Sequence, residues 1–146
     1  MWRSTRFRIV PAAMVIALVS GCAPDPAGQD LCAQYADVKA AAEEFRAAPP
    51  LSTDNAEDFQ ASVDELRERA DTVSDQLDQL QQVSEGRLDT AISSVRQRAA
   101  EVKQSLAVAT YEAAATLGPQ VEAAQEELDA AFAQLDQRVQ TQCPAG

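Results

Sequence analysis

The chain has 146 residues, with 23 acidic and 12 basic side chains, a net charge of −11 and no histidine. This length allows one modest hydrophobic core, which predicts a single domain. The excess of acid repels phosphate backbones and anionic headgroups, so nucleic acid is excluded as a partner. The lack of histidine removes the commonest general base and metal ligand, which argues against an enzyme.

The first 21 residues have the pattern of an export signal. Three arginines (Arg3, Arg6 and Arg8) precede an uncharged run from Ile9 to Val19. As a helix this run would span only about 16 Å, against roughly 30 Å for the hydrocarbon core of a bilayer. The pattern therefore predicts a cleaved signal peptide over residues 1–21 and not a transmembrane anchor.

The end of this signal, Val19-Ser20-Gly21-Cys22, resembles the lipobox of bacterial lipoproteins. The resemblance covers only the first 22 residues. It implies that Cys22 carries a diacylglycerol and becomes the first residue of the mature chain, anchored at the extracytoplasmic face of the cell membrane. Cleavage would remove three arginines and no acid, so the net charge would fall from −11 to −14. The alternative is an ordinary signal peptide that a cysteine happens to follow.

Lipidation of Cys22 would leave Cys32 and Cys143 as a pair near the two ends of the mature domain. In an oxidising compartment this pair predicts a disulfide. Closing a loop of this length could stabilise the fold by roughly 4 to 5 kcal/mol in the chain-entropy model. A redox or metal-binding pair is the alternative, and neither CxxC spacing nor a histidine supports it.

Strong breakers divide the rest of the chain. A Pro/Gly/Ala-rich tether is predicted over residues 22–29, followed by a helical bundle domain over residues 30–146. Breaks at Pro49-Pro50, Gly86 and Gly118-Pro119 give four helices. Asp54 is the expected N-cap of the second helix, with Glu57 completing a capping box, and Pro119 is expected in the first turn of the fourth.

Apolar residues recur at steps of three and four along each helical segment, which predicts one buried face per helix. The step between Leu80 and Leu88 is eight, so the pattern slips beside Gly86. The expected core positions are Leu31, Tyr35, Val38, Ala42 and Phe45; Phe59, Val63, Leu66, Ala70, Val73, Leu77 and Leu80; Leu88, Ile92, Val95, Ala99, Val102, Leu106, Ala109 and Ala113; and Val121, Ala124, Leu128, Phe132, Leu135 and Val139.

Gly86 is interpreted as a hairpin turn. One straight helix from about residue 55 to 117 would hold the paired cysteines about 35 Å apart, too far for a disulfide. The sequence therefore predicts an all-α, up-down-up-down four-helix bundle with coiled-coil-like seams. The fourth helix is expected to be shorter than the second and third, so the helix 2/helix 3 hairpin would project about 11 Å beyond the cysteines. Segment 106–117, apolar almost all round, is expected where all four helices enclose it.

No constellation of catalytic residues emerges from the motifs. The acidic residues lie between apolar positions on helices, where they are expected to face water. The serines lack a partner base, and there is no glycine-rich phosphate cradle. No metal, cofactor or enzymatic activity is expected.

The sequence favours a noncatalytic, membrane-anchored envelope lipoprotein that acts as an interaction module or spacer, with an envelope protein as its possible partner. The alternative is a small-ligand or lipid carrier with a cavity among small side chains. The candidate interaction tip consists of Glu85, Gly86, Arg87, Arg96 and Arg98. A second candidate surface is acidic and bears Glu43, Glu44, Asp54, Glu57 and Asp58. The alanines that motivate the carrier alternative are Ala99, Ala109, Ala113, Ala124 and Ala131.

Overall fold

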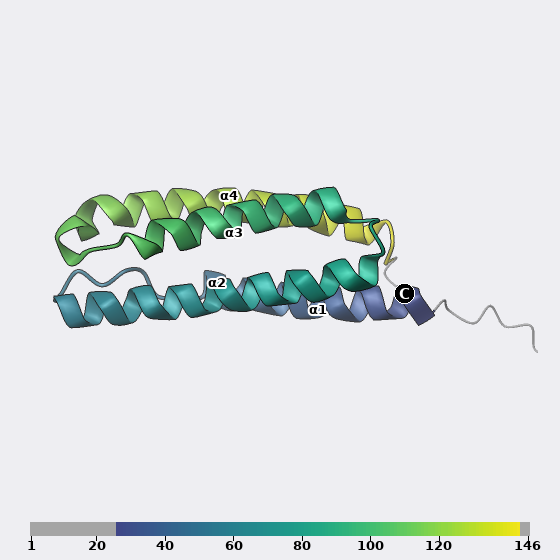
Figure 1. Cartoon of the computed structure of the whole chain (residues 1–146), viewed down its shortest axis with the longest axis horizontal. Helices are drawn as coiled ribbons and strands as arrows, with labels where there is room; N and C mark the ends of the chain where they lie inside the picture. Colours follow the sequence, from purple (N-terminus) through teal and green to yellow (C-terminus); the bar gives the residue numbers. More distant parts are fainter. Residues whose placement is uncertain (1–25, 144–146) are drawn as a thin grey trace, which may run out of the picture.

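A computed structural model describes residues 26–143 of the chain. Within this range the elements are α1 (Pro26–Arg46), α2 (Ala56–Ser84), α3 (Asp89–Ala107), the 3-10 turn η1 (Tyr111–Ala113) and α4 (Ala114–Gln140). The described part contains no strand. The protein is therefore an all-α four-helix bundle, as the sequence predicts (Figure 1). None of its described helices combines the length and apolar character needed to cross a membrane.

The helices form two hairpins, α1 with α2 and α3 with α4, which lie side by side (Figure 1). Side-chain contacts between neighbours run antiparallel, since residues late in one helix meet residues early in the next. Examples are Gln34 with Gln76 and the Glu44 carbonyl with Arg69 between α1 and α2, Asp71 with Lys103 and Asp78 with Arg96 between α2 and α3, and Arg98 with Glu127 between α3 and α4.

The core follows the predicted seams closely. Every expected position in α1 and α2 is buried, as are those from Leu88 to Leu106. In the fourth seam Ala124 is only partly buried, and the other expected positions are buried. The third seam departs from the prediction at its end, where Ala109 is partly buried and Ala113 is exposed.

The near pole is the end of the bundle that holds the start of α1, the Gly86 turn and the end of α4. Cys32 and Cys143, the predicted pair, lie here at disulfide distance, with their Cα atoms 5.7 Å apart. Positive φ angles at Glu85 (51°) and Gly86 (84°) reverse the chain between α2 and α3. The Arg87 guanidinium donates a hydrogen bond to the side chain of Gln142, 3.4 Å away.

The contact between Arg87 and Gln142 places the Gly86 turn beside the end of α4, so the expected projection beyond the cysteines is absent. The prediction placed the break between the third and fourth helices at Gly118-Pro119, but α3 already ends at Ala107. Helix α4 begins at Ala114 and contains Pro119 in its second turn. Pro119 is the sixth residue of α4, so the helix lacks the one backbone hydrogen bond that residue 119 would otherwise donate to the Ala115 carbonyl. Because α3 has only 19 residues and α4 has 27, α3 does not extend beyond α4, and the Gly86 turn lies level with the end of α4.

Two further boundaries differ from the sequence prediction. Helix α1 begins at Pro26, inside the segment expected to be a tether, because proline suits the first turn of a helix. The N-cap of α2 is Asn55 and not Asp54, since the Asn55 side chain accepts a 2.9 Å hydrogen bond from the Asp58 backbone N–H.

The far pole is the opposite end, formed by connections 47–55 and 108–113 and the helix ends that they join. Helix α1 does not reach it. The last residue of α1, Arg46, pairs with Asp129 of α4, whereas α4 starts fifteen residues earlier at Ala114, a rise of about 22 Å. The coil 47–55 covers this remaining length (Figure 1). Segment 106–117 is therefore flanked by three helices and a coil, and is not enclosed as expected.

Candidate functional site

The five residues predicted as an interaction tip do not form one surface. Glu85 and Gly86 lie in the turn, and Arg87 also donates to the Ser84 carbonyl, 3.0 Å away. Arg96 and Arg98 lie on α3, about 15 and 18 Å along the helix from Gly86. Both of these arginines make ion pairs within the bundle.

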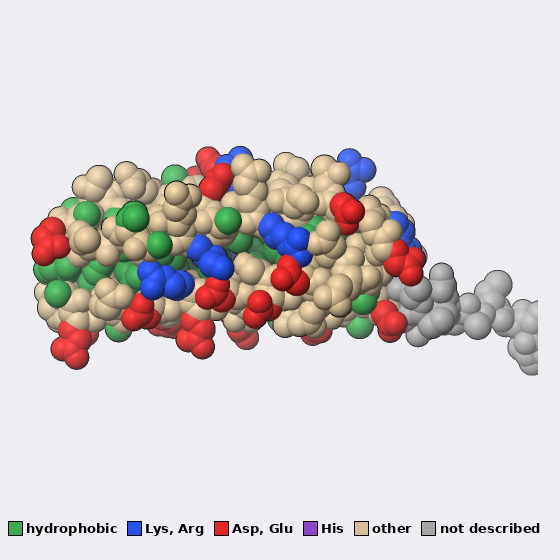
Figure 2. Space-filling view, viewed as in Figure 1, with side chains coloured by type: hydrophobic (Ala, Val, Ile, Leu, Met, Phe, Trp, Pro, Cys, Tyr) green, Lys and Arg blue, Asp and Glu red, His purple; other side chains and the backbone are tan. Residues whose placement is uncertain are grey.

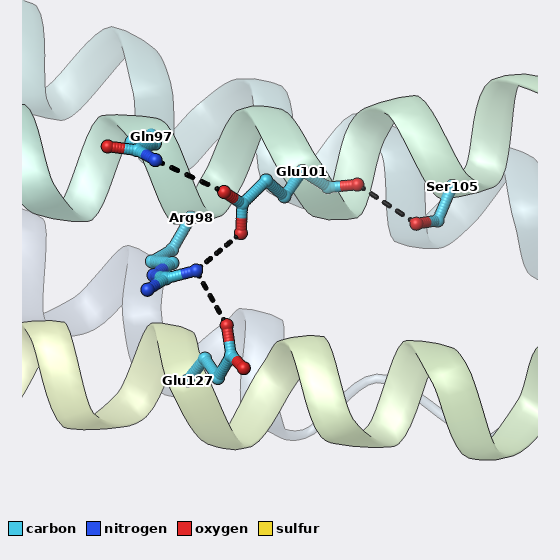
Figure 3. A network of polar contacts seen from close by, with 5 residues as sticks. All are labelled: Gln97, Arg98, Glu101, Ser105 and Glu127. Atoms are coloured by element: carbon cyan, nitrogen blue, oxygen red, sulfur yellow. Dashed lines mark hydrogen bonds and ion pairs between the residues drawn. The ribbon is translucent and has the colours of Figure 1, made fainter.

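Arg98 joins α3 to α4. Its Nη1 donates to Glu101 at 2.8 Å and to Glu127 at 2.6 Å, while Gln97 also donates to Glu101 (Figure 3). The hydrogen bond to Glu101 raises the pKa of Arg98, and the same bond lowers the pKa of Glu101. Both changes favour the charged pair within α3, and the contact with Glu127 connects α3 to α4.

A shallow groove separates α1 from α4, with a volume of about 220 Å³. The Tyr35 hydroxyl donates a 2.7 Å hydrogen bond to Asp136, and the Arg46 guanidinium lies 5.7 Å from the centre of the Phe132 ring. Burial, followed by the bond to Asp136, raises the pKa of Tyr35. The polar side chains of this groove mostly bond one another, so they tie the two helices together.

The far pole carries the apolar surface of the molecule. Among the described residues, Val108 is 74% exposed and Tyr111 is 36% exposed, and these are the large apolar side chains that face water. The Tyr111 hydroxyl donates to the Thr53 carbonyl at 3.1 Å, and its ring meets Phe59 edge-on at 6.0 Å. Apolar side chains gather over this end of the bundle (Figure 2).

A cleft of about 310 Å³, here called the far-pole cleft, opens between coil 47–55 and α4. It exists because the coil is thinner than the helix that would otherwise continue α1. Its floor includes the buried residues Leu66, Ala114 and Val121. Its walls and rim are Ala48, Pro49, Pro50, Leu51, Thr53, Ala115, Gly118, Pro119, Glu122 and Gln125.

One carboxylate, Glu122, lines the far-pole cleft, and Asp54 follows the lining residue Thr53 in the chain. Glu112 follows Tyr111, whose hydroxyl bonds the Thr53 carbonyl. The exposed side chains of Asp54, Glu57, Glu112 and Glu122 are absent from the ion pairs of residues 26–143. Basic side chains instead follow the seam between α2 and α3 (Figure 2), where each has an acidic or carbonyl partner. The far pole therefore carries both exposed apolar side chains and unpaired carboxylates.

Sequence reasoning placed Asp54 and Glu57 on an acidic surface and missed the apolar one. The available signal was the apolar segment 106–117, which was interpreted as enclosed. Within residues 26–143 no group of three or more His, Cys, Asp or Glu could hold a metal ion. The predicted lipidation site Cys22 lies outside the described residues.

The sequence matches no protein-family model, and neither a curated protein nor a solved structure is significantly similar to it.

Proposed function

We propose that this protein is a noncatalytic envelope lipoprotein, anchored through lipid on Cys22, whose bundle presents its far pole to a protein partner. The observation that carries the proposal is the position of the exposed apolar surface. Val108, Tyr111 and the far-pole cleft all lie at the pole opposite the disulfide.

The anchor and the apolar surface would be at opposite ends of a rigid spacer. Cys22 lies four residues before the start of α1, so a lipid there would hold the near pole within about 14 Å of the membrane. The 29 residues of α2 span about 43 Å. The far pole would therefore stand several nanometres above the headgroups, out of contact with the membrane and accessible to another protein.

Exposed apolar side chains rimmed by polar groups are typical of protein-binding surfaces. The other large apolar residues of the described chain are buried or partly buried, so the exposed Val108 and Tyr111 depart from the pattern of this molecule. A partner that covers Val108 and Tyr111 would remove this apolar surface from water.

Site-specific photocrosslinking in the native envelope tests the far pole. A photoreactive residue at Val108 is expected to form a discrete protein adduct, because this side chain is the most exposed of the large apolar residues. The matched control carries the same group at Asp75, an exposed position midway along α2, and should form no such adduct. Equal yields at both positions, or none at Val108, would contradict the proposal.

Mass spectrometry of the mature protein tests the anchor. We expect cleavage before Cys22 with a diacylglycerol on that residue, and release of the Cys22→Ala variant from membranes. An unmodified cysteine in a membrane-free protein would contradict this part of the proposal.

A further inference from the structure

We propose that the partner segment is a basic amphipathic helix that places an apolar side chain in the far-pole cleft and its lysines or arginines against Glu122 in the cleft wall and the carboxylates Asp54 and Glu112 near it. This inference rests on the proposed function, which requires a protein partner at the far pole. It adds the chemistry of that partner.

The shape of the cleft favours an apolar anchor from a helix. A volume of about 310 Å³ is at the lower end of the range for small-ligand pockets, roughly 300 to 1,000 Å³, and suits one or two large side chains. The floor at Leu66 and Val121 is apolar, and three helices already flank this end of the bundle. A helix laid along the groove is a common way to bury such apolar residues.

The charge around the cleft favours a basic partner. Asp54, Glu112 and Glu122 are exposed and without ion pairs in the described chain. Arg67, which follows Leu66 of the cleft floor in the chain, already bonds the Leu106 carbonyl at 2.8 Å, and Lys103 pairs with Asp71. A basic segment would therefore meet carboxylates free to pair with it.

The same charges disfavour two other occupants. Two copies meeting by their far poles would bring unpaired carboxylates into opposition, which is repulsive. Anionic lipid headgroups would be repelled in the same way.

A synthetic helical peptide with a lysine face and a leucine face tests the inference. The mature lipidated chain, in nanodiscs of zwitterionic lipid, is titrated into the fluorescently labelled peptide and anisotropy is measured, with empty nanodiscs as the blank. We expect saturable binding that weakens as salt is raised to about 0.5 M. Peptides with glutamate in place of lysine, or alanine in place of leucine, are expected not to bind. Equal binding of the glutamate peptide would overturn the inference.

Variants of the protein localise the binding. A triple variant should bind the lysine–leucine peptide about tenfold more weakly at low salt, because it removes negative charges in and near the cleft. Its substitutions are Asp54→Asn, Glu112→Gln and Glu122→Gln. Asp37→Asn, Glu68→Gln and Asp75→Asn remove the same number of exposed charges from the flanks of the bundle, and should change affinity less than about twofold. Equal weakening by the two sets would overturn the inference.

Gly118→Leu tests the cleft itself. A Cβ at Gly118 would meet no atom within 4 Å, and leucine favours a helix over glycine, so the variant should fold and fill the cleft. We expect it to abolish peptide binding. Undiminished binding would show that the peptide lies elsewhere and would overturn the inference.

The cellular crosslink separates the two proposals. If no adduct forms at Val108 in the native protein, the proposed function fails. If the adduct forms and persists undiminished both in the three-carboxylate cleft variant and in Gly118→Leu, the far pole has a partner and the inference about its chemistry is wrong.

Discussion

Tyr35 and Asp136 form a tie between α1 and α4 at the level of single residues. The tyrosine ring is 8% exposed, and its hydroxyl donates to a carboxylate that Lys39 also approaches at 3.7 Å. The hydrogen bond from Tyr35 is the main cause that lowers the pKa of Asp136. A carboxyl group whose pKa is lower in the folded than in the unfolded state stabilises the fold, and this stabilisation is complete at pH values above the ordinary carboxyl pKa. That stability is lost as pH falls through the lowered value.

Tyr35→Phe should therefore have a pH-dependent cost. We expect it to reduce the free energy of unfolding by about 1 kcal/mol at neutral pH, and by less at an acid pH below the lowered pKa of Asp136. Urea unfolding of variant and parent at both pH values measures the difference.

Tyr111→Phe is the matched control, because the Tyr111 hydroxyl donates to a backbone carbonyl that does not titrate in this range. Its cost should be similar at the two pH values. If the loss of unfolding free energy in Tyr35→Phe is also the same at both pH values, the role assigned to Asp136 is wrong.

At the scale of the elements, two glycines differ in what their backbone requires. Gly86 has a φ of +84°, and a Cβ there would meet only the Asp89 carboxylate at an ordinary 3.6 Å, so the backbone angle is the constraint. Gly118 lies inside α4, with open space around it and no positive φ. Glycine is thus required in the turn and costly in the helix.

The Gly86→Ala and Gly118→Ala variants should move stability in opposite directions. Alanine at Gly86 must adopt a left-handed conformation and should cost about 1 to 2 kcal/mol. Alanine at Gly118 should stabilise the chain by about 0.5 to 1 kcal/mol, because it favours the helix. Thermal unfolding of the two variants measures both, and a shift of the same sign in each would refute this reading of the turn.

The start of α2 offers a second test at this scale. Because the Asn55 side chain accepts from the Asp58 N–H, Asn55→Ala should lower the free energy of unfolding by about 1 kcal/mol. Asp54→Ala, at the neighbouring exposed position predicted as the cap, should change it by less than about 0.5 kcal/mol. Equilibrium unfolding in urea compares them; a larger loss in Asp54→Ala would restore Asp54 as the cap.

Considered as a whole, the molecule has both covalent links between its hairpins at the near pole. The chain passes from α2 to α3 through Gly86, and the pair Cys32 and Cys143 joins α1 to the end of α4 across a separation of 111 residues. The far pole has noncovalent contacts between the hairpins, such as the bond from Tyr111 to Thr53. The cleft therefore lies at the end where the hairpins are less tightly constrained.

Removal of the disulfide should destabilise the whole bundle. Cys32→Ser with Cys143→Ser frees a loop of more than 100 residues, and the free energy of unfolding should fall by up to about 4 to 5 kcal/mol. Hydrogen exchange should rise first in the first turns of α1 and the last turn of α4. Reductant should reproduce the loss in the parent and leave the variant unchanged; an effect of reductant on the variant would contradict the assignment.

The sequence by itself determined the helical class, the buried face of each helix and the pairing of Cys32 with Cys143. The first two follow from local periodicity, and the pairing follows from the expected lipidation of Cys22, which leaves two of the three cysteines. Each can be read without knowing which helix lies beside which. The seam from Phe59 to Leu80 needed no tertiary information, because a spacing of three and four residues leaves one face apolar in any bundle.

Only the tertiary structure decided where helices end relative to their neighbours. Pro119 can begin a helix or lie within one, and the choice depends on the contacts available to residues 114–118. The shortfall of α1 at Arg46 is a difference in level between helices far apart in sequence, and no local pattern encodes it. This difference exposes Val108 and Tyr111 and opens the far-pole cleft, because a coil covers less apolar surface than the helix whose place it takes.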